Sequence, residues 1–418
     1  MQISLVLQAL LGILVFIGIG TLFSSNYRRI NWKLVAFAVA LQFIICLLLL
    51  KAPGIRDGLQ YANRAVAALG AATMKGTSFV YGYLGGGATP FTVTNPSALF
   101  TFAFQSMPLV IVISALASLL WYWRILPFVI SGIAYLFKRT LGTRGPVGLV
   151  VTSNIFLGQV EAPLLVRPYL ARMTQYELLL VLTAGMAMIA GSVMVIYAAM
   201  LGPQIDGVLG HLITKSLMSV PGSIMFAHLM LPEDNEASAE LDKPPSMYES
   251  SMDAITRGTS DGLHVYMNVL AILIVLIALV ALANGMIGAW LPEVNGAPLS
   301  LERMAGWVFA PIAWLMGIPW KEALVSGSLL GVKTILNEFI AYLQMKDVPG
   351  AVLGDHSRLI TLYALCGFAN LSSMGIQISG IGVLAPERRG DLTRLAFRAL
   401  IAAELASCVC GSIVGIVA

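Results

Sequence analysis

Apolar stretches of about 20 residues recur along this chain, and each is long enough to cross the hydrocarbon core of a bilayer as a helix. Eight are clear, at residues 3–23, 33–51, 99–123, 178–201, 209–231, 263–290, 357–385 and 392–417. Only 11% of the 418 residues are charged, against roughly 25% in ordinary soluble domains. The sequence therefore predicts an all-α membrane protein with eight transmembrane helices.

Two further apolar segments, 146–171 and 321–345, are interrupted by polar residues at their centres. Lys and Arg in short loops mark the cytoplasmic side of a membrane protein. The basic loops share one side only if both segments are re-entrant hairpins, which enter and leave on the same face. This arrangement predicts that both termini lie outside. The basic residues concerned are Arg28, Arg29, Lys33, Arg124, Lys138, Arg139, Arg144, Arg388, Arg389 and Arg394.

A short internal repeat links the two halves of the chain. The sequence TAGMAMIAGSVM at 183–194 aligns with ALCGFANLSSMG at 364–375, and each follows one of the hairpins. An odd number of crossings separates the copies, so they are inverted with respect to the membrane. Inverted repeats with interrupted helices are typical of secondary transporters, whose site lies at the midplane where the repeats meet.

The hairpins place carboxylates within the membrane, beside amides. Glu161 follows Gln159 in the first hairpin, and Glu338 follows Asn337 in the second. Because an ionisable residue in a membrane is costly, each glutamate is a functional candidate. The alternative is a structural ion pair, of Glu338 with Lys333 or of Glu161 with Arg167. Glu404, which has no polar cluster near it in the sequence, is interpreted as a structural carboxylate.

The repeated Gly-rich helix of the second half carries Asn370, Ser372 and Ser373 beside Phe368. These side chains could present an amide and a hydroxyl to a polar solute, with the aromatic ring stacked on a planar group. The alternative for the serines is a hydrogen bond back to their own helix, and for Phe368 an ordinary core position.

The sequence argues against other classes of function. It has no HExxH motif, its four histidines are scattered, and its cysteines lie in apolar segments without metal-ligand spacing. We therefore expect no enzyme activity and no cofactor. The net charge is +4, and the sequence has no basic stretch long enough to suggest nucleic-acid binding. A channel would not need inverted hairpins that carry carboxylates.

The remaining segments have simpler interpretations. Residues 55–76 are weakly amphipathic, which is typical of a helix along the membrane interface. The Gly-rich run at 82–90 lacks the GK[ST] sequence of a phosphate-binding loop, so we predict a flexible external loop there. The acidic stretch at 232–260 reads as a cytoplasmic loop between the two halves.

Four motifs in this order resemble the concentrative nucleoside transporter family, in its short bacterial form: GQVEAPLLVRPYL at 158–170, GMAMIAGSVM at 185–194, NEFIAYL at 337–343 and CGFAN at 366–370. The resemblance implies a homotrimer that imports nucleosides such as uridine with a cation across the inner membrane by alternating access. It implies a trimerisation scaffold at 1–125 and 261–292, the loop at 232–260, and a transport domain formed by repeats at 126–231 and 300–418.

Site residues carried over from the family fall into two groups. The nucleoside would contact Gln159, Val160, Glu161, Val193, Glu338, Phe368, Asn370 and Ser373. The cation would bind at Asn154, Leu157, Met188 and Ile189. Two positions depart from the family, where Val160 and Met188 replace residues that carry hydroxyls. We expect Na⁺ in preference to H⁺, because carbonyl oxygens suit a hard cation. An H⁺-coupled nucleoside importer, and a symporter of nucleobases or of another small polar metabolite, are the alternatives.

Overall fold

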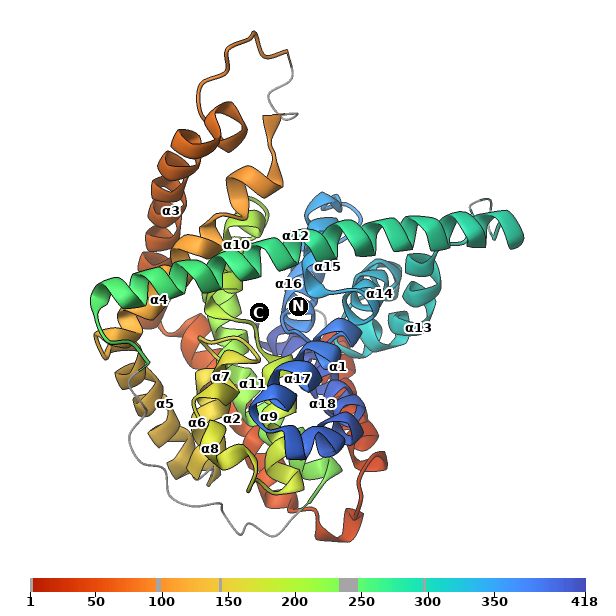
Figure 1. Ribbon diagram of the computed structural model, residues 1–418. Helices are drawn as coiled ribbons and strands as arrows, with labels where there is room; N and C mark the ends of the chain where they lie inside the picture. The colour runs from red at the N-terminus through yellow and green to blue at the C-terminus, as the bar shows by residue number, and fades with distance from the viewer. Residues whose placement is uncertain (1–2, 95–98, 143–144, 233–246, 295, 297) are drawn as a thin grey trace.

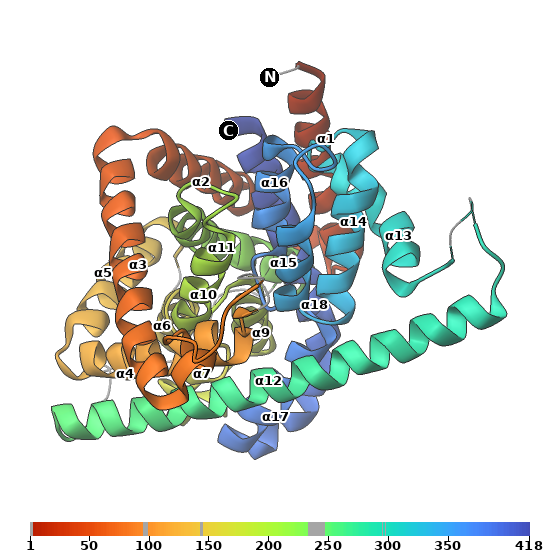
Figure 2. The same cartoon turned by 90° about the horizontal axis from the view of Figure 1, so that it is seen from above.

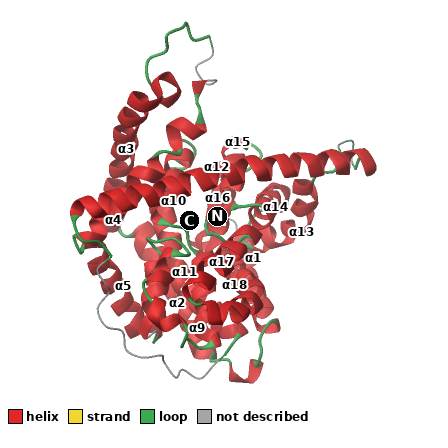
Figure 3. Cartoon of the chain, in the orientation of Figure 1, coloured by secondary structure: helices red, strands yellow, loops and turns green. Residues whose placement is uncertain are grey.

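A computed structural model describes all of the chain except residues 1–2, 95–98, 143–144, 233–246, 295 and 297. Arg144 and residues 233–246 of the loop expected at 232–260 lie outside the described residues. The described residues form helices joined by loops (Figure 3). The first half contains α1 (Ile3–Leu22), α2 (Trp32–Lys51), α3 (Pro53–Tyr81), α4 (Leu109–Tyr122), α5 (Ile125–Leu141), α6 (Gly145–Ser153), α7 (Glu161–Leu164), α8 (Arg167–Leu170), α9 (Gln175–Ala187), α10 (Gly191–Leu201) and α11 (Val208–Met230).

The second half begins with α12, a helix of 40 residues that runs past the rest of the molecule (Figure 1). Its start at Ser251 lies inside the segment expected to be a loop, so the prediction of a loop up to residue 260 was wrong. A serine N-cap at Ser250 explains the early start, since its side chain accepts a hydrogen bond from the backbone N–H of Asp253. The helices that follow are α13 (Leu301–Leu315), α14 (Trp320–Ile335), α15 (Glu338–Asp347), α16 (Asp355–Leu365), α17 (Leu371–Leu384) and α18 (Arg389–Val417).

Among the described residues, six helical segments are long and apolar enough to cross a membrane, where the sequence predicts eight crossings. A seventh crossing is possible if α13 and α14, which meet at an angle of 119°, count as one broken span. The expected crossing at 357–385 is divided into α16 and α17, so neither piece has the full length. The one at 209–231 forms α11, which is buried along most of its length and so needs no apolar face toward lipid.

The centre of the molecule is formed by α9, α11, α16 and α18, which pack against one another with most side chains buried (Figure 2). Around this centre, α12 packs against α4 through a GxxxG sequence. A Cβ at Gly258 would lie 2.8 Å from the Cα of Ala115, and a Cβ at Gly262 would lie 2.7 Å from the Cα of Ile111. Glycine at both positions therefore lets the two helix backbones approach closely.

The segments at the edge differ in part from expectation. The amphipathic segment expected at 55–76 forms the longer helix α3, which projects from the body in Figure 1. Part of the Gly-rich run forms a short 3₁₀ helix, Gly82–Gly85, instead of a loop. The Thr77 hydroxyl donates a hydrogen bond to the Gly85 carbonyl at 2.9 Å and ties this turn to α3.

Candidate functional site

Both Gly-rich helices are interrupted at equivalent places in the two repeats. Helix α9 ends at Ala187 and α10 begins at Gly191, while α16 ends at Leu365 and α17 begins at Leu371. The interruptions lie against each other, because the backbone N–H of Phe368 donates to the carbonyl of Met188 at 3.3 Å. The structure thus brings the two repeat motifs together, and carbonyls at the end of α9 are released from helical hydrogen bonding.

The two hairpins present their polar residues at turns. In the first, α6 ends at Ser153 and α7 begins at Glu161, so Gln159 lies in the turn. In the second, the Asn337 side chain caps α15 by accepting from the backbone N–H of Ile340 at 2.9 Å. This cap separates α14 from α15 and places Glu338 in the first turn of α15.

A cavity lies where the hairpins, the interrupted helices, α4 and α12 meet, with about 1100 Å³ of empty volume including its open mouth. Every residue expected to contact the nucleoside lines it: Gln159, Val160, Glu161, Val193, Glu338, Phe368, Asn370 and Ser373. The residues expected to bind the cation do not line this cavity; they lie beside it, at the turn of the first hairpin and at the end of α9.

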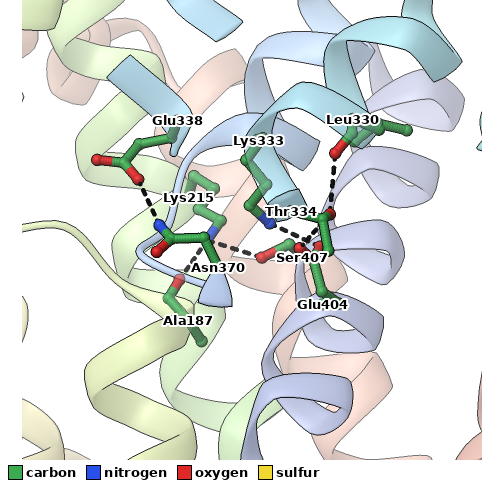
Figure 4. Close-up of polar contacts among 9 residues, drawn as sticks. All are labelled: Ala187, Lys215, Leu330, Lys333, Thr334, Glu338, Asn370, Glu404 and Ser407. Carbon is green, nitrogen blue, oxygen red and sulfur yellow. Dashed lines mark hydrogen bonds and ion pairs between the residues drawn. The ribbon is translucent and has the colours of Figure 1, made fainter. Parts of the chain in front are cut away.

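Glu338 is held by both repeats. Its Oε1 accepts from the hydroxyl of Tyr197 on α10 at 2.7 Å. Its Oε2 accepts from the Nδ2 of Asn370 at 3.0 Å, as Figure 4 shows. Asn370 also caps α17, because its Oδ1 accepts from the backbone N–H of Ser373 at 2.8 Å. The same amide therefore begins a helix and orients the carboxylate. Ser372 donates to that Oδ1 at 2.7 Å and does not bond back to its own helix.

The first hairpin contributes an exposed carboxylate and a buried amide. Glu161 faces the cavity mouth, and its carboxylate folds back so closely on Gly158 that a Cβ there would collide with it. The Oε1 of Gln159 is buried without a hydrogen-bond partner. Val160 packs on Gly380 of α17, where a Cβ would lie 2.7 Å from its Cγ1. Gln159 is therefore left with an acceptor that a ligand can use.

The expected cation residues fit a cation bound by oxygen atoms. Asn154 is 2% exposed, and its Oδ1 has no hydrogen-bond partner. Met188 and Ile189 are buried in the interruption between α9 and α10. The turn that contains Leu157 is tied to this interruption by a 3.0 Å hydrogen bond from the backbone N–H of Gly191 to the carbonyl of Phe156. An orphaned amide oxygen beside released carbonyls is the kind of donor set that a hard cation uses.

The structural ion pairs weighed as alternatives do not form. Lys333, which is fully buried, pairs with Glu404 at 2.6 Å and not with Glu338. Glu404 also accepts from the Thr334 hydroxyl at 2.9 Å. Its structural role is as expected, but the polar partners come from α14, far away in the sequence. Glu161 forms no ion pair with Arg167 in the described part of the chain.

Four polar residues near the site were missed by the sequence analysis. Tyr197 and Asn268 line the cavity. Gln377 is fully buried on α17 with both amide atoms unpartnered, and a Cβ at Gly185 would collide with it. Lys215 is fully buried on α11. A signal was available for Lys215, because it is an ionisable residue inside an apolar span, as the glutamates are. Gln377 lies one helical turn after Ser373, which is a weaker signal.

Comparison with known proteins identifies the family to which these features belong. Residues 211–415 match the C-terminal region of Na⁺-dependent nucleoside transporters, and residues 11–84 match their N-terminal region. Residues 103–204 match a domain described as nucleoside recognition. The chain is 33% identical to the nucleoside permease NupC of Helicobacter pylori, over 98% of this chain and 97% of that protein. It belongs to the concentrative nucleoside transporter family.

Two further relatives agree with this assignment. The chain is 33% identical to sodium/nucleoside cotransporter 1 of Mus musculus, over 97% of this chain but only 63% of that longer protein. It superposes on the inward-facing, substrate-bound structure of CNTnw with a TM-score of 0.88 and 34% identity, covering 99% of this chain and 98% of that one. This member of the family is thus a multi-pass membrane transporter and not an enzyme, as the sequence predicts.

Proposed function

We propose that this transporter imports nucleosides together with Na⁺ by alternating access across a bacterial inner membrane. The observation that carries the proposal is the cavity between the two repeats, in which the Glu338 carboxylate is fixed by Tyr197 and Asn370. A carboxylate can accept about four hydrogen bonds in all. Two are used, so capacity remains for the vicinal hydroxyls of a ribose.

The proposed substrate contacts divide between the two ends of a nucleoside. Glu338, Asn370 and Ser373 bind the ribose, and Gln159 binds the base through its unpartnered Oε1. Glu161, Val160, Val193 and Phe368 complete the wall around the ring. Because Val160 cannot donate a hydrogen bond, selectivity among bases depends on Gln159 and on shape. A nucleobase lacks the ribose and would leave the carboxylate without a partner.

The proposed Na⁺ site uses the Asn154 Oδ1 and carbonyls at Leu157, Met188 and Ile189. Met188 contributes its carbonyl, since its side chain offers no hard oxygen. The first hairpin and the end of α9 would then hold the cation between them. Because Gln159 lies in the same turn, cation binding would order the segment that contacts the base. This supports coupling of the two solutes.

The proposed architecture has eight crossings and two re-entrant hairpins, with both termini outside. A transport domain, at 126–231 and 300–418, moves against a scaffold at 1–125 and 261–292. In support of this division, α4 and α12 supply one wall of the cavity through Val110, Val265 and Asn268. A homotrimer assembled through the scaffold is proposed from the family, and the many exposed apolar side chains of α12 are compatible with it.

The test is uptake of radiolabelled uridine into proteoliposomes, with Na⁺ and pH gradients set independently. We expect saturable uptake that requires Na⁺, shows counterflow and is inhibited by excess uridine but not by excess uracil. The variant Met188→Thr should raise Na⁺ affinity by adding a hydroxyl oxygen. Uptake that persists in choline medium and rises between pH 7.5 and pH 5.5 would instead establish the H⁺-coupled importer. Equal inhibition by uracil would establish a nucleobase carrier.

A further inference from the structure

The Nζ of Lys215 lies in the core between α9, α11 and α18, and its described hydrogen-bond partners include no carboxylate. Lys215 is fully buried on α11. Its Nζ donates hydrogen bonds to the carbonyl of Ala187 and, at 3.2 Å, to the hydroxyl of Ser407 on α18 (Figure 4). The other lysine in this part of the core, Lys333, pairs with Glu404. Both described partners of Lys215 are therefore neutral oxygens.

The end of α9 is placed to stabilise a positive charge on this Nζ. Ala187 is the last residue of a 13-residue helix, and the carbonyls of the last turn lack partners within the helix. The C-terminus of a helix carries a partial negative charge and favours a cation. The Lys215 Nζ thus occupies the place at the carbonyl end of α9 where a bound cation would be stabilised. The interruption at Met188 exposes this end inside the protein, next to the residues proposed to bind Na⁺.

We infer that Lys215 is a tethered cation that shares the carbonyl end of α9 with the mobile coupling ion and lowers the affinity for that ion. The inference rests on the proposed cation site. One residue spans at most about 3.6 Å, so an ion held by the carbonyls of Met188 and Ile189 lies within about 10 Å of the Lys215 Nζ. Two like charges at this separation repel each other appreciably where water does not screen them.

A purely structural lysine is the competing interpretation. Such a lysine would hold α9, α11 and α18 together, and its replacement would alter stability without changing the response to Na⁺. The two roles predict different Na⁺ dependences of nucleoside affinity. The quantity to compare is the Na⁺ concentration at which the increase in nucleoside affinity is half-maximal. Among variants that remain folded, replacing Lys215 changes this Na⁺ concentration only if the lysine acts on the bound ion.

Two variants neutralise the charge in different ways. Lys215→Met removes it and retains an unbranched side chain of similar length. Ser407→Asp keeps the lysine and places a carboxylate beside its Nζ. The first control, Ser407→Ala, removes the hydrogen bond between Lys215 and Ser407 but keeps the lysine. The second control, Lys321→Met, removes an exposed lysine at the start of α14. All four are compared with the unaltered transporter in detergent.

Uridine binding is measured by calorimetry over a series of Na⁺ concentrations, with thermal melting as the check of folding. We expect Lys215→Met and Ser407→Asp to lower the half-saturating Na⁺ concentration by about fivefold or more, while Ser407→Ala and Lys321→Met change it by less than twofold. If Lys215→Met does not fold, Ser407→Asp against Ser407→Ala decides the question. An unchanged Na⁺ response in folded charge-neutralised variants overturns the inference.

The same titration separates this inference from the proposed coupling ion. If the unaltered protein responds to Na⁺ and the variants respond equally, the inference fails and the coupling ion stands. If the unaltered protein ignores Na⁺ but Lys215→Met acquires a response, the assignment of Na⁺ to the natural protein fails and the tethered cation stands. If no form responds to Na⁺, both are overturned.

Discussion

Replacing Glu338 by glutamine is expected to weaken nucleoside binding strongly while the protein stays folded. The carboxylate has two anchors, Tyr197 at 2.7 Å and Asn370 at 3.0 Å, and both are donors. An amide has one acceptor oxygen, so its NH₂ group would face one of these donors. The variant therefore loses the charge that we propose the ribose hydroxyls use, and it also misorients the group that remains.

The magnitude follows from the remaining hydrogen-bonding capacity of the carboxylate. A hydrogen bond to a charged group contributes about 1.5–3 kcal/mol, and about 1.4 kcal/mol corresponds to a tenfold change in affinity. Loss of one such bond predicts that the Kd for uridine rises roughly 10- to 100-fold in Glu338→Gln. Tyr197→Phe leaves the carboxylate in place and removes only one anchor, so its effect should be smaller.

Calorimetric titration of the purified protein with uridine measures both variants, and a melting curve confirms that each is folded. A Kd for Glu338→Gln within twofold of the natural value would refute the assignment of this carboxylate to the ribose. An effect of Tyr197→Phe larger than that of Glu338→Gln would show instead that the tyrosine hydroxyl binds the ligand directly.

Three further substitutions test the packing around the site. Gly185→Ala brings a methyl group against a buried amide, so we expect about 1–3 kcal/mol of destabilisation and a lower melting temperature, whereas Gly375→Ala has open space and should be neutral. Lys333→Met leaves the partly buried Glu404 carboxylate without its ion-pair partner, which should cost up to about 3 kcal/mol and be visible as loss of the folded peak in size-exclusion chromatography. Gly262→Ala forces α4 and α12 apart and should reduce uridine uptake, while Gly285→Ala on the same helix meets nothing within 4 Å and should leave uptake unchanged.

The sequence predicts the site better than it predicts the connections around it. Polar residues inside apolar segments locate the turns between α6 and α7 and between α14 and α15, because such residues are costly in lipid unless they have a function. The Gly-rich repeat locates the interruptions of the helices. Tyr197 on α10, a partner of Glu338, is 141 residues away from it in the sequence. The pattern of apolar spans does not show that two such distant residues are in contact. In the sequence alone, Tyr197 therefore cannot be distinguished from an aromatic residue of the core.

Other differences have equally local causes. Helix α12 begins ten residues before the expected scaffold segment because Ser250 supplies a cap, which hydropathy does not detect. Helix α11 carries Lys215 and Pro221 in a stretch apolar enough to be counted as a span, but it is enclosed by other helices. Burial of a whole helix by protein replaces contact with lipid and depends on tertiary packing, which a single sequence does not show.

The length of α12 relates this transporter to the thickness of its membrane. Forty residues extend about 60 Å, and the apolar part at 263–290 alone extends about 42 Å, whereas the hydrocarbon core measures about 30 Å. A helix with so long an apolar part accommodates the excess by tilting, by kinking or by thickening the bilayer around it. Longer acyl chains would draw it upright, and α4, which is joined to it at Gly258 and Gly262, would turn with it. If α12 tilts, one wall of the cavity moves with bilayer thickness, and we predict that the turnover of this carrier varies with the acyl-chain length of the vesicles that contain it.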